Sequence, residues 1–161
     1  MSPSPQCDPI GTIHSPFDEP SGMPIQPPVS ADTEGTVDVQ SQYADGLADL
    51  DGFSHCILLY QFHEAGEAAL AVTPFLDDEE RGVFATRAPT RPNPIGLSVV
   101  GIEAIDGASM TVRGIDVLDG TPLLDVKPFV PGFDVPEDAE TGWIDADEQS
   151  SARGYADDRF V

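Results

Sequence analysis

Basic residues are scarce in this chain of 161 residues: seven Lys and Arg stand against 29 Asp and Glu, which gives a formal net charge of −22. The acidic residues are spread along the chain, so no acidic tail accounts for them. The basic surface that nucleic-acid-binding proteins usually carry is therefore missing. Apolar runs such as FSHCILLYQF argue against disorder. We expect a halophilic protein, because molar salt shortens the screening length to about 3 Å and makes self-repulsion tolerable.

Cysteines and long apolar segments are also few. Cys7 and Cys56 are the only cysteines, and no histidines accompany them at the spacing of a metal site. We expect no metal and a reduced Cys56 buried in its apolar run. No apolar run reaches the roughly 20 residues of a membrane-spanning helix, and the first residues lack the basic and apolar parts of a signal peptide. The sequence therefore predicts a cytoplasmic protein with no membrane partner.

Several catalytic motifs do not occur. The chain has no Gly-x-Ser-x-Gly, no His-Glu-x-x-His, no Gly-Lys-Ser/Thr and no Cys-x-x-Cys. It also lacks a glycine-rich turn between a strand and a helix in the order that dinucleotide-binding domains use. These absences weigh against a hydrolase, a metalloprotease, a nucleoside triphosphatase, a zinc protein and a doubly wound fold.

Short strand-like runs bounded by Gly, Pro and Asp dominate what is present, and helical periodicity is scarce. Strands are expected in PIGTIHSPF, GTVDVQ, SHCILLYQFH, ALAVTPFL, GVFATR, IGLSVVGIEAI, MTVRGIDVL and DGTPLLDVKPFV, with one short helix in YADGLADLDGF. Many short strands at regular spacing predict an all-β protein, a single small antiparallel β-barrel domain with short helices and a C-terminal extension.

The expected domain limits follow the same pattern. An N-terminal extension covers 1–8, the barrel covers 9–136, and an acidic C-terminal segment covers 137–161. Its three aromatic residues, Trp143, Tyr155 and Phe160, are expected to dock this segment on the barrel.

The stretch GVFATRAPTRPNPIGLS carries two of the seven cations, Arg87 and Arg91, beside two prolines that bracket Asn93. Each proline restricts its own backbone and that of the preceding residue, so a stiff loop is expected between a strand closed by Arg87 and another beginning near Ile95. Arg87 and Arg91 could bind a carboxylate or a phosphate through paired donors. The alternative is a rigid turn whose arginines pair with surface acids.

His63 ends the apolar run FSHCILLYQFH, where its side chain could face a pocket or simply form a hydrogen bond at the end of a strand. His55 is eight residues away, about 26 Å along one strand, which is too far for the two to share a metal.

The stretch VLDGTPLLDVKP begins with a turn signal at Asp119 and Gly120. Exposed amides of Gly120 and Thr121 could bind a ligand there. The alternative is an ordinary turn followed by an exposed ion pair between Asp125 and Lys127, which share a strand face.

These stretches, taken with PIGTIHSPF and in the order in which they occur, resemble the TsaA-like (TrmO) family from about Pro9 to Asp134. ATRAPTRPNPIGLS is the longest and most specific part of the match. The resemblance implies a β-barrel methyltransferase that binds S-adenosyl-L-methionine, forms a homodimer and acts on tRNA. The implied substrate is threonylcarbamoyl-adenosine beside the anticodon. The proline-rich loop reads PIQPPV where an arginine often precedes the glutamine in bacterial members.

The resemblance also implies cofactor contacts from four places in the chain. They are Pro27, Pro28 and Val29; His63 and Glu64; Arg87 and Leu97; and Gly120, Thr121, Pro122 and Leu123. Arg91 and Asn93 would support the loop or contact RNA. Because the acceptor nitrogen has a delocalised lone pair, a general base is expected, with His63, Asp119 and Asp125 as unranked candidates. Two alternatives stay open: a cofactor-binding module without RNA methylation, and a small-molecule methyltransferase.

Overall fold

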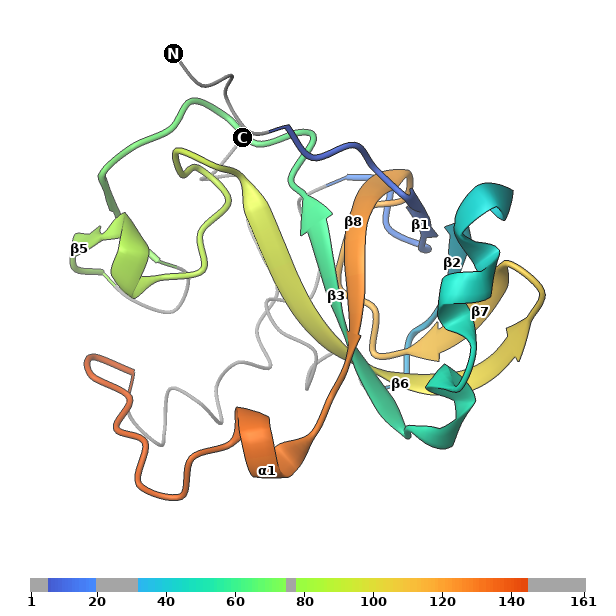
Figure 1. Cartoon of the computed structure of the whole chain (residues 1–161). Coiled ribbons are helices and arrows are strands. Elements are labelled where there is room, and N and C mark those ends of the chain that lie inside the picture. The colour runs from blue at the N-terminus through green and yellow to red at the C-terminus, as the bar shows by residue number, and fades with distance from the viewer. Residues whose placement is uncertain (1–5, 20–31, 75–77, 145–161) are drawn as a thin grey trace, which may run out of the picture.

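Six antiparallel strands close into a barrel in the order β1-β2-β7-β6-β3-β8, as the computed structural model shows over residues 6–19, 32–74 and 78–144 (Figure 1). The strands are β1 Gly11–His14, β2 Glu34–Val39, β3 His55–Gln61, β6 Ile95–Asp106, β7 Ser109–Arg113 and β8 Thr121–Pro128. This confirms the predicted all-β barrel.

The core fills the barrel because side chains alternate between its inside and its outside along each strand. On β3, Cys56, Leu58 and Tyr60 point inward and are buried. Cys56 is a free thiol, as predicted, and burial raises its pKa to about 12. An uncharged thiol in an apolar interior behaves as a small packing group.

The hairpin of β6 and β7 follows the prediction closely. β6 is the longest strand at 12 residues, and it pairs with β7 up to Asp106 and Ser109. The turn between them contains Gly107 with φ of +61°. Asp-Gly suits such a tight connection because glycine adopts positive φ without steric cost.

A small satellite lies beside the barrel, and here the strands are shorter than expected. Over its described residues, which end at Pro74, ALAVTPFL contributes only β4 Ala71–Val72. GVFATR follows β5 Arg81–Gly82, whose second residue it shares, and contains the 3₁₀ helix η4 Val83–Ala85. The chain turns at η4 because both the amide and the hydroxyl of Thr86 donate to the Val83 carbonyl. Arg87 therefore follows a helical turn and closes no strand.

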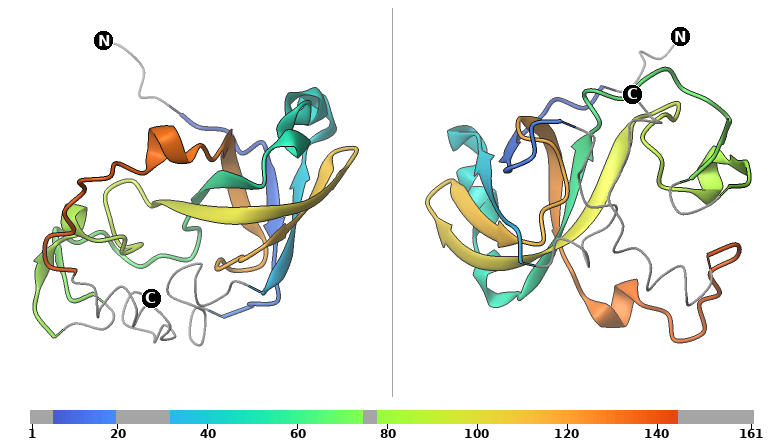
Figure 2. Two further views of the ribbon diagram at one scale, coloured as in Figure 1. Left: turned by 90° about the horizontal axis from the view of Figure 1, so that it is seen from below. Right: turned by 180° about the vertical axis from the view of Figure 1, so that it is seen from behind.

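The satellite has its own small core of Val72, Val83 and Ala88. Figure 2 shows it as a separate lobe next to the beginning of β6. The chain beyond the short helix α1 Pro131–Asp134 returns to this lobe. There the indole of Trp143 donates to the Ala85 carbonyl at 2.7 Å and packs against the Arg81 guanidinium.

Trp143 thus anchors its segment on the satellite rather than on the barrel wall. Tyr155 and Phe160 lie outside the described residues. Within the described part of the chain, no helix is long and apolar enough to cross a membrane.

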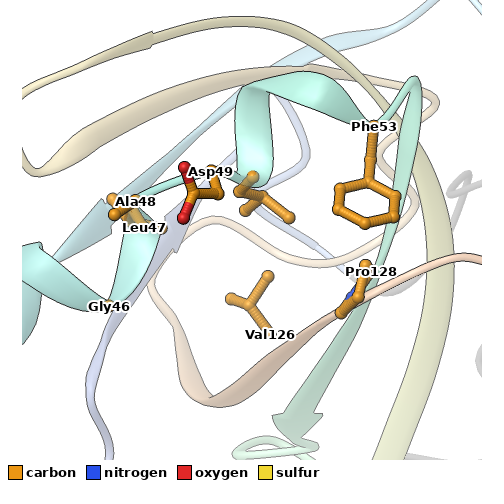
Figure 3. A pocket seen from close by; sticks show the side chains of 8 residues that line it. Gly46, Leu47, Ala48, Asp49, Phe53, Val126 and Pro128 are labelled. Carbon is orange, nitrogen blue, oxygen red and sulfur yellow. The ribbon is translucent and has the colours of Figure 1, made fainter.

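One short helix was expected before Gly52, but two 3₁₀ helices occur, η2 Ser41–Leu47 and η3 Leu50–Gly52. Asp49 separates them with a left-handed φ of 69°. Both helices pack near the end of β8, where they line a shallow groove of about 160 Å³ with Val126 and Pro128 (Figure 3). The groove walls are mostly apolar, and Asp49 is the one charged residue among them.

Candidate functional site

The barrel topology brings the segments that resemble the family together at one end. β3 runs toward that end, and its two neighbours, β6 and β8, begin there (Figure 1). The register shows this directly, because Tyr60 near the end of β3 faces both Gly96 and Leu123. β1 also ends there, since Ile13 pairs with Thr121. Four segments far apart in the sequence therefore meet at one end of the barrel, which we call the site end.

The groove of Figure 3 lies at the other end, where β3 begins and β8 finishes. Of the predicted cofactor contacts, Pro27, Pro28 and Val29 lie outside the described residues.

The loop after η4 is braced from within by Arg91. Its guanidinium donates to the carbonyls of Thr86 at 2.9 Å and Ala88 at 3.2 Å, and it lies 5.9 Å from the ring centre of Phe84. The side chain is half-buried. Arg91 therefore binds backbone carbonyls and an aromatic ring of its own loop, a set of partners that neither sequence interpretation had named.

Arg87 is exposed on the same loop, between the buried residues Thr86 and Ala88. Leu97 lies on the outer face of β6, and 40% of its surface is exposed although it is apolar. Arg87 thus offers a cation and Leu97 an apolar wall on the outside of the site end. The exposed Asn93 lies in the turn that leads into β6, where its carbonyl accepts from the Ile95 amide at 2.7 Å.

His63 and Glu64 form an exposed turn directly after β3. The turn is held against the loop because the Phe62 amide donates to the Pro94 carbonyl at 2.7 Å. The structure therefore brings the end of the apolar strand next to the Pro-Asn-Pro sequence.

The backbone amides of the turn before β8, which were expected to be exposed, are hydrogen-bonded within the chain. Gly120, with φ of +82°, donates its N–H to the Ile13 carbonyl at 2.9 Å, and Thr121 donates to Leu118 at 3.3 Å. Both amides thus already have partners within the chain, so the expectation of exposed amides was wrong. The side chains of Thr121 and Leu123 point into the barrel.

Asp119 is the exposed carboxylate of this turn. It accepts from the Ser15 backbone N–H at 3.1 Å and lies 3.2 Å from Nδ1 of His14. These hydrogen bonds, led by that of Ser15, lower the pKa of Asp119. The other nitrogen of His14 lies 3.3 Å from Asp38. Asp119 is therefore held as an anion at the site end.

Asp125 lies farther along β8. Its carboxylate pairs with Lys127 at 3.0 Å and accepts from the Val126 amide at 2.9 Å. The sequence analysis gave this exposed ion pair as the alternative to a ligand-binding role.

A buried polar chain inside the site end was not found from the sequence. The Ser98 hydroxyl donates to Asp116 at 2.6 Å and lies 2.7 Å from the Tyr60 hydroxyl. Because serine has one hydroxyl proton and gives it to Asp116, Tyr60 must donate to Ser98. The three residues come from β3, β6 and the segment before β8. All three are buried.

Burial strongly shifts the pKa values of the two titratable groups in this hydrogen-bond chain, Asp116 and Tyr60. Desolvation raises the pKa of the Asp116 carboxyl to about 7, although the Ser98 hydrogen bond and the charge of Arg87 lower it. Burial, and then the nearby Asp116, raise the pKa of Tyr60, while Arg87 lowers it. Arg87 therefore acts electrostatically on both buried groups from outside. The one available signal in the sequence was a lone acid within the otherwise apolar run GIDVL.

Among the described residues, no cluster of His, Cys, Asp and Glu has the arrangement of a metal site.

Comparison with known proteins then identifies the fold and its relatives. The family model described as the tRNA-methyltransferase O N-terminal domain matches residues 12–135. A protein of Pyrococcus abyssi named as a probable S-adenosyl-L-methionine-binding protein is 50% identical over 152 residues, covering 94% of this chain and 83% of its own.

Two further relatives are longer than this chain. The rat tRNA (adenine(37)-N6)-methyltransferase is 34% identical over 140 residues, which are 83% of this chain and 32% of that enzyme. The crystal structure of TrmO from Pseudomonas aeruginosa matches with a TM-score of 0.75 and 39% identity, covering 88% of this chain and 63% of that one. The match of the family model over most of the chain, together with these relatives, shows that the chain belongs to the tRNA-methyltransferase O N-terminal domain family.

Proposed function

We propose that this protein is an S-adenosyl-L-methionine-dependent methyltransferase that acts on threonylcarbamoyl-adenosine next to the tRNA anticodon. The observation that carries the proposal is the meeting of the family's segments at the site end, where the end of β3 and the beginnings of β6 and β8 lie together. The names of the relatives support the cofactor and, for the rat enzyme, the tRNA substrate.

The residues at the site end fit the chemistry of the cofactor. S-adenosyl-L-methionine carries a carboxylate, an ammonium, a sulfonium and an adenine. Arg87 would bind the carboxylate through paired hydrogen bonds. Leu97 would provide an apolar wall for the adenine, since ligand sites combine apolar walls with a few placed polar groups. Asp119, held as an anion, would favour the positive groups.

When bound, the cofactor supplies a methyl group that its sulfonium activates. The protein's part is to place the acceptor nitrogen in line and to remove its proton, and positioning supplies much of the rate in such a transfer. Of the three candidate bases, Asp119 is stabilised as an anion and Asp125 is paired with Lys127. His63 is exposed beside the loop, and imidazole is the side chain best suited to proton transfer near neutral pH. We therefore rank His63 first.

The decisive experiment combines binding with a nucleoside profile. Calorimetry in molar potassium chloride should show that the purified protein binds S-adenosyl-L-methionine or its demethylated product. Mass spectrometry of tRNA from cells with and without the gene should show that methylated threonylcarbamoyl-adenosine disappears on deletion. Persistence of that nucleoside after deletion would overturn the tRNA substrate. Absence of binding at millimolar ligand would overturn the whole proposal.

One observation favours a second candidate, a cofactor-binding module without RNA methylation. The net charge of −22 opposes binding to a polyanion. Binding of the cofactor together with an unchanged nucleoside profile would select this candidate.

We also propose that the protein is a homodimer with the cofactor sites near the interface. Ile95 and Leu97 alternate with buried residues on β6, yet 44% and 40% of their surfaces are exposed. Neighbouring exposed apolar residues favour burial against a second copy, since most oligomers are symmetric pairs of one surface. Light scattering in molar potassium chloride should give twice the 17.1 kDa chain mass. A particle of 17.1 kDa would contradict the dimer.

A further inference from the structure

Trp143 is the one tryptophan of the chain, and it lies beyond the last residue that the family model matches. It occupies a tight turn in which Gly142 adopts a φ of +59°. The Ile144 amide donates to the Thr141 carbonyl at 3.0 Å, and the Thr141 hydroxyl donates to the Ile144 carbonyl. These two hydrogen bonds fix the backbone on both sides of Trp143. The proposed function gives this residue no role.

The side chain of Trp143 contacts the chain on both sides of η4. Its indole N–H donates at 2.7 Å to the carbonyl of Ala85, the last residue of η4. The carbonyls at the end of a helix have no partner within the helix, so the indole gives Ala85 one from outside. The Arg81 guanidinium, from the strand that precedes η4, lies 5.3 Å from the centre of the Trp143 ring. This is the geometry of a cation–π contact.

The satellite depends on contacts of this kind because its own packing is small. Over the described residues, its buried core consists of Val72, Val83 and Ala88, and its ladder is the two-residue pair of β4 and β5. A two-stranded pairing is marginal by itself, and regions with few buried apolar contacts open at low cost in free energy. Contacts from outside the satellite therefore decide how firmly η4 is held.

Arg87 follows η4 directly along the chain. Only Thr86 separates it from Ala85, and the Thr86 backbone is extended, with φ of −135°. Thr86 is itself fixed, because its amide and hydroxyl donate to the Val83 carbonyl and its own carbonyl accepts from the Arg91 guanidinium at 2.9 Å. A displacement of η4 is therefore passed on to the backbone of Arg87.

We propose that Trp143 is a positioning residue for the cofactor site: its indole latches the turn after α1 onto η4 and so fixes the direction from which Arg87 reaches the cofactor's carboxylate. The inference rests on the proposed function, because it concerns the same cofactor. The latched satellite binds the cofactor more tightly than the open one. By linkage, the cofactor then favours the latched state by the same factor.

A double-mutant cycle tests whether Trp143 acts through Arg87. Wild type, Trp143→Phe, Arg87→Ala and the double variant are each titrated with S-adenosyl-L-methionine by calorimetry in molar potassium chloride. Trp143→Phe keeps an aromatic ring beside Arg81 and removes the N–H. It should weaken binding about fivefold in the wild-type background, the change in latched population that the loss of one ordinary hydrogen bond gives. In the Arg87→Ala background the loss should be less than about twofold.

The indole proton itself gives a second readout, which a purely structural role would not change. Because Trp143 is the one tryptophan, its indole N–H can be followed alone by NMR. A hydrogen-bonded N–H exchanges with solvent while its bond is open. Saturating S-adenosyl-L-methionine should slow this exchange in wild type by at least about fivefold, because the cofactor and the latch strengthen each other equally. In cofactor-saturated Arg87→Ala the exchange should slow less than about twofold.

Three outcomes would overturn the inference while wild type still binds the cofactor, so that the proposed function stays intact. One is an equal loss of affinity in both backgrounds, which a purely structural role of Trp143 would give. The others are wild-type affinity in Trp143→Phe and an indole exchange rate that saturating cofactor leaves unchanged. If wild type itself fails to bind, the proposed function fails, and the inference fails with it.

Phe133→Ala is the matched control, because it removes an aromatic side chain that is 85% exposed on α1, earlier in the same part of the chain. Its affinity and its indole exchange should match wild type, and a loss equal to that of Trp143→Phe would overturn the inference. If Trp143→Phe does not fold by circular dichroism, the exchange measurement on wild type decides alone. Slower exchange with cofactor supports the latch, and unchanged exchange overturns it.

Discussion

At the scale of single residues, the two arginines of the loop have different surroundings. Arg91 is half-buried and donates to two backbone carbonyls, while Arg87 is exposed at the site end and acts on Asp116. They stand four positions apart on a loop that contains prolines, so their side chains can point in independent directions.

Replacing each arginine should therefore have a different effect. Arg87→Ala should weaken S-adenosyl-L-methionine binding by about 1.5–3 kcal/mol, the range for a charge-assisted hydrogen bond. Arg91→Ala should lower the melting temperature and change the affinity less. Arg87→Lys should restore only part of the binding, because an ammonium cannot reproduce a planar fork. Titration of the three variants at one salt concentration checks this, and a larger loss of affinity at Arg91 would show that the roles are reversed.

Asp116 should give the protein a pH-dependent stability. Its pKa is 3.8 in the unfolded reference and about 7 in the fold. Between these values the unfolded chain has lost a proton that the folded protein keeps, so the free energy of unfolding falls as pH rises and levels off above about 7. Asp116→Asn removes this contribution.

Urea unfolding of both proteins across this pH range, in constant molar salt, measures the difference. Wild type should lose stability relative to Asp116→Asn as pH rises toward 7. Asp106→Asn controls for the change in net charge. A wild-type advantage that instead grew with pH would contradict the burial of a protonated carboxyl.

At the scale of elements, the packing of β3 against β6 depends on Gly96. It lies opposite Tyr60 in the register, and a Cβ at this position would collide with the Tyr60 ring and the tip of Phe62. The conformational freedom of glycine is not the reason for its presence here; the missing side chain is. Within PIGLS, Gly96 is therefore needed so that β6 can pack against Tyr60, and Leu97 is the exposed apolar residue that follows it.

Gly96→Ala should destabilise the protein by about 1–3 kcal/mol, the usual cost of overpacking. It should also weaken cofactor binding, because Tyr60 belongs to the hydrogen-bond chain beneath the site. Gly82→Ala is the matched control, since a Cβ there meets nothing within 4 Å. Urea unfolding of the two variants tests the prediction, and equal stabilities would show that β3 and β6 yield easily at this point.

At the scale of the whole molecule, the excess of negative charge makes the stability of the fold depend on salt. A net charge of −22 on 161 residues repels itself in dilute salt. The melting temperature should fall markedly when molar potassium chloride is diluted to 0.1 M, where the screening length grows to about 10 Å. Circular dichroism during dilution measures this. Sucrose, which favours compact states without screening, should restore less of the loss than salt does; an unchanged melting temperature would defeat the halophilic interpretation.

The sequence by itself determined the strand class, the hairpin at Asp106 and Gly107, the burial of Cys56 and the restricted backbone angles of the prolines that bracket Asn93. These features depend on local chemistry: alternation, turn residues and restricted backbone angles act within a few residues. The strand expected to run through GVFATR to Arg87 was wrong because the amide and the hydroxyl of Thr86 both donate to the Val83 carbonyl and turn the chain there.

Only the tertiary structure decided which polar groups meet. Ser98 and Asp116 are 18 residues apart, and Tyr60 is 38 residues from Ser98, so their contacts depend on strand register and barrel closure. The same closure used the amides of Gly120 and Thr121 for the chain's own hydrogen bonds. It also left Arg87 exposed on the loop after η4. Such long-range pairing has no local signal, because one face of a strand looks the same in sequence whichever neighbour it receives.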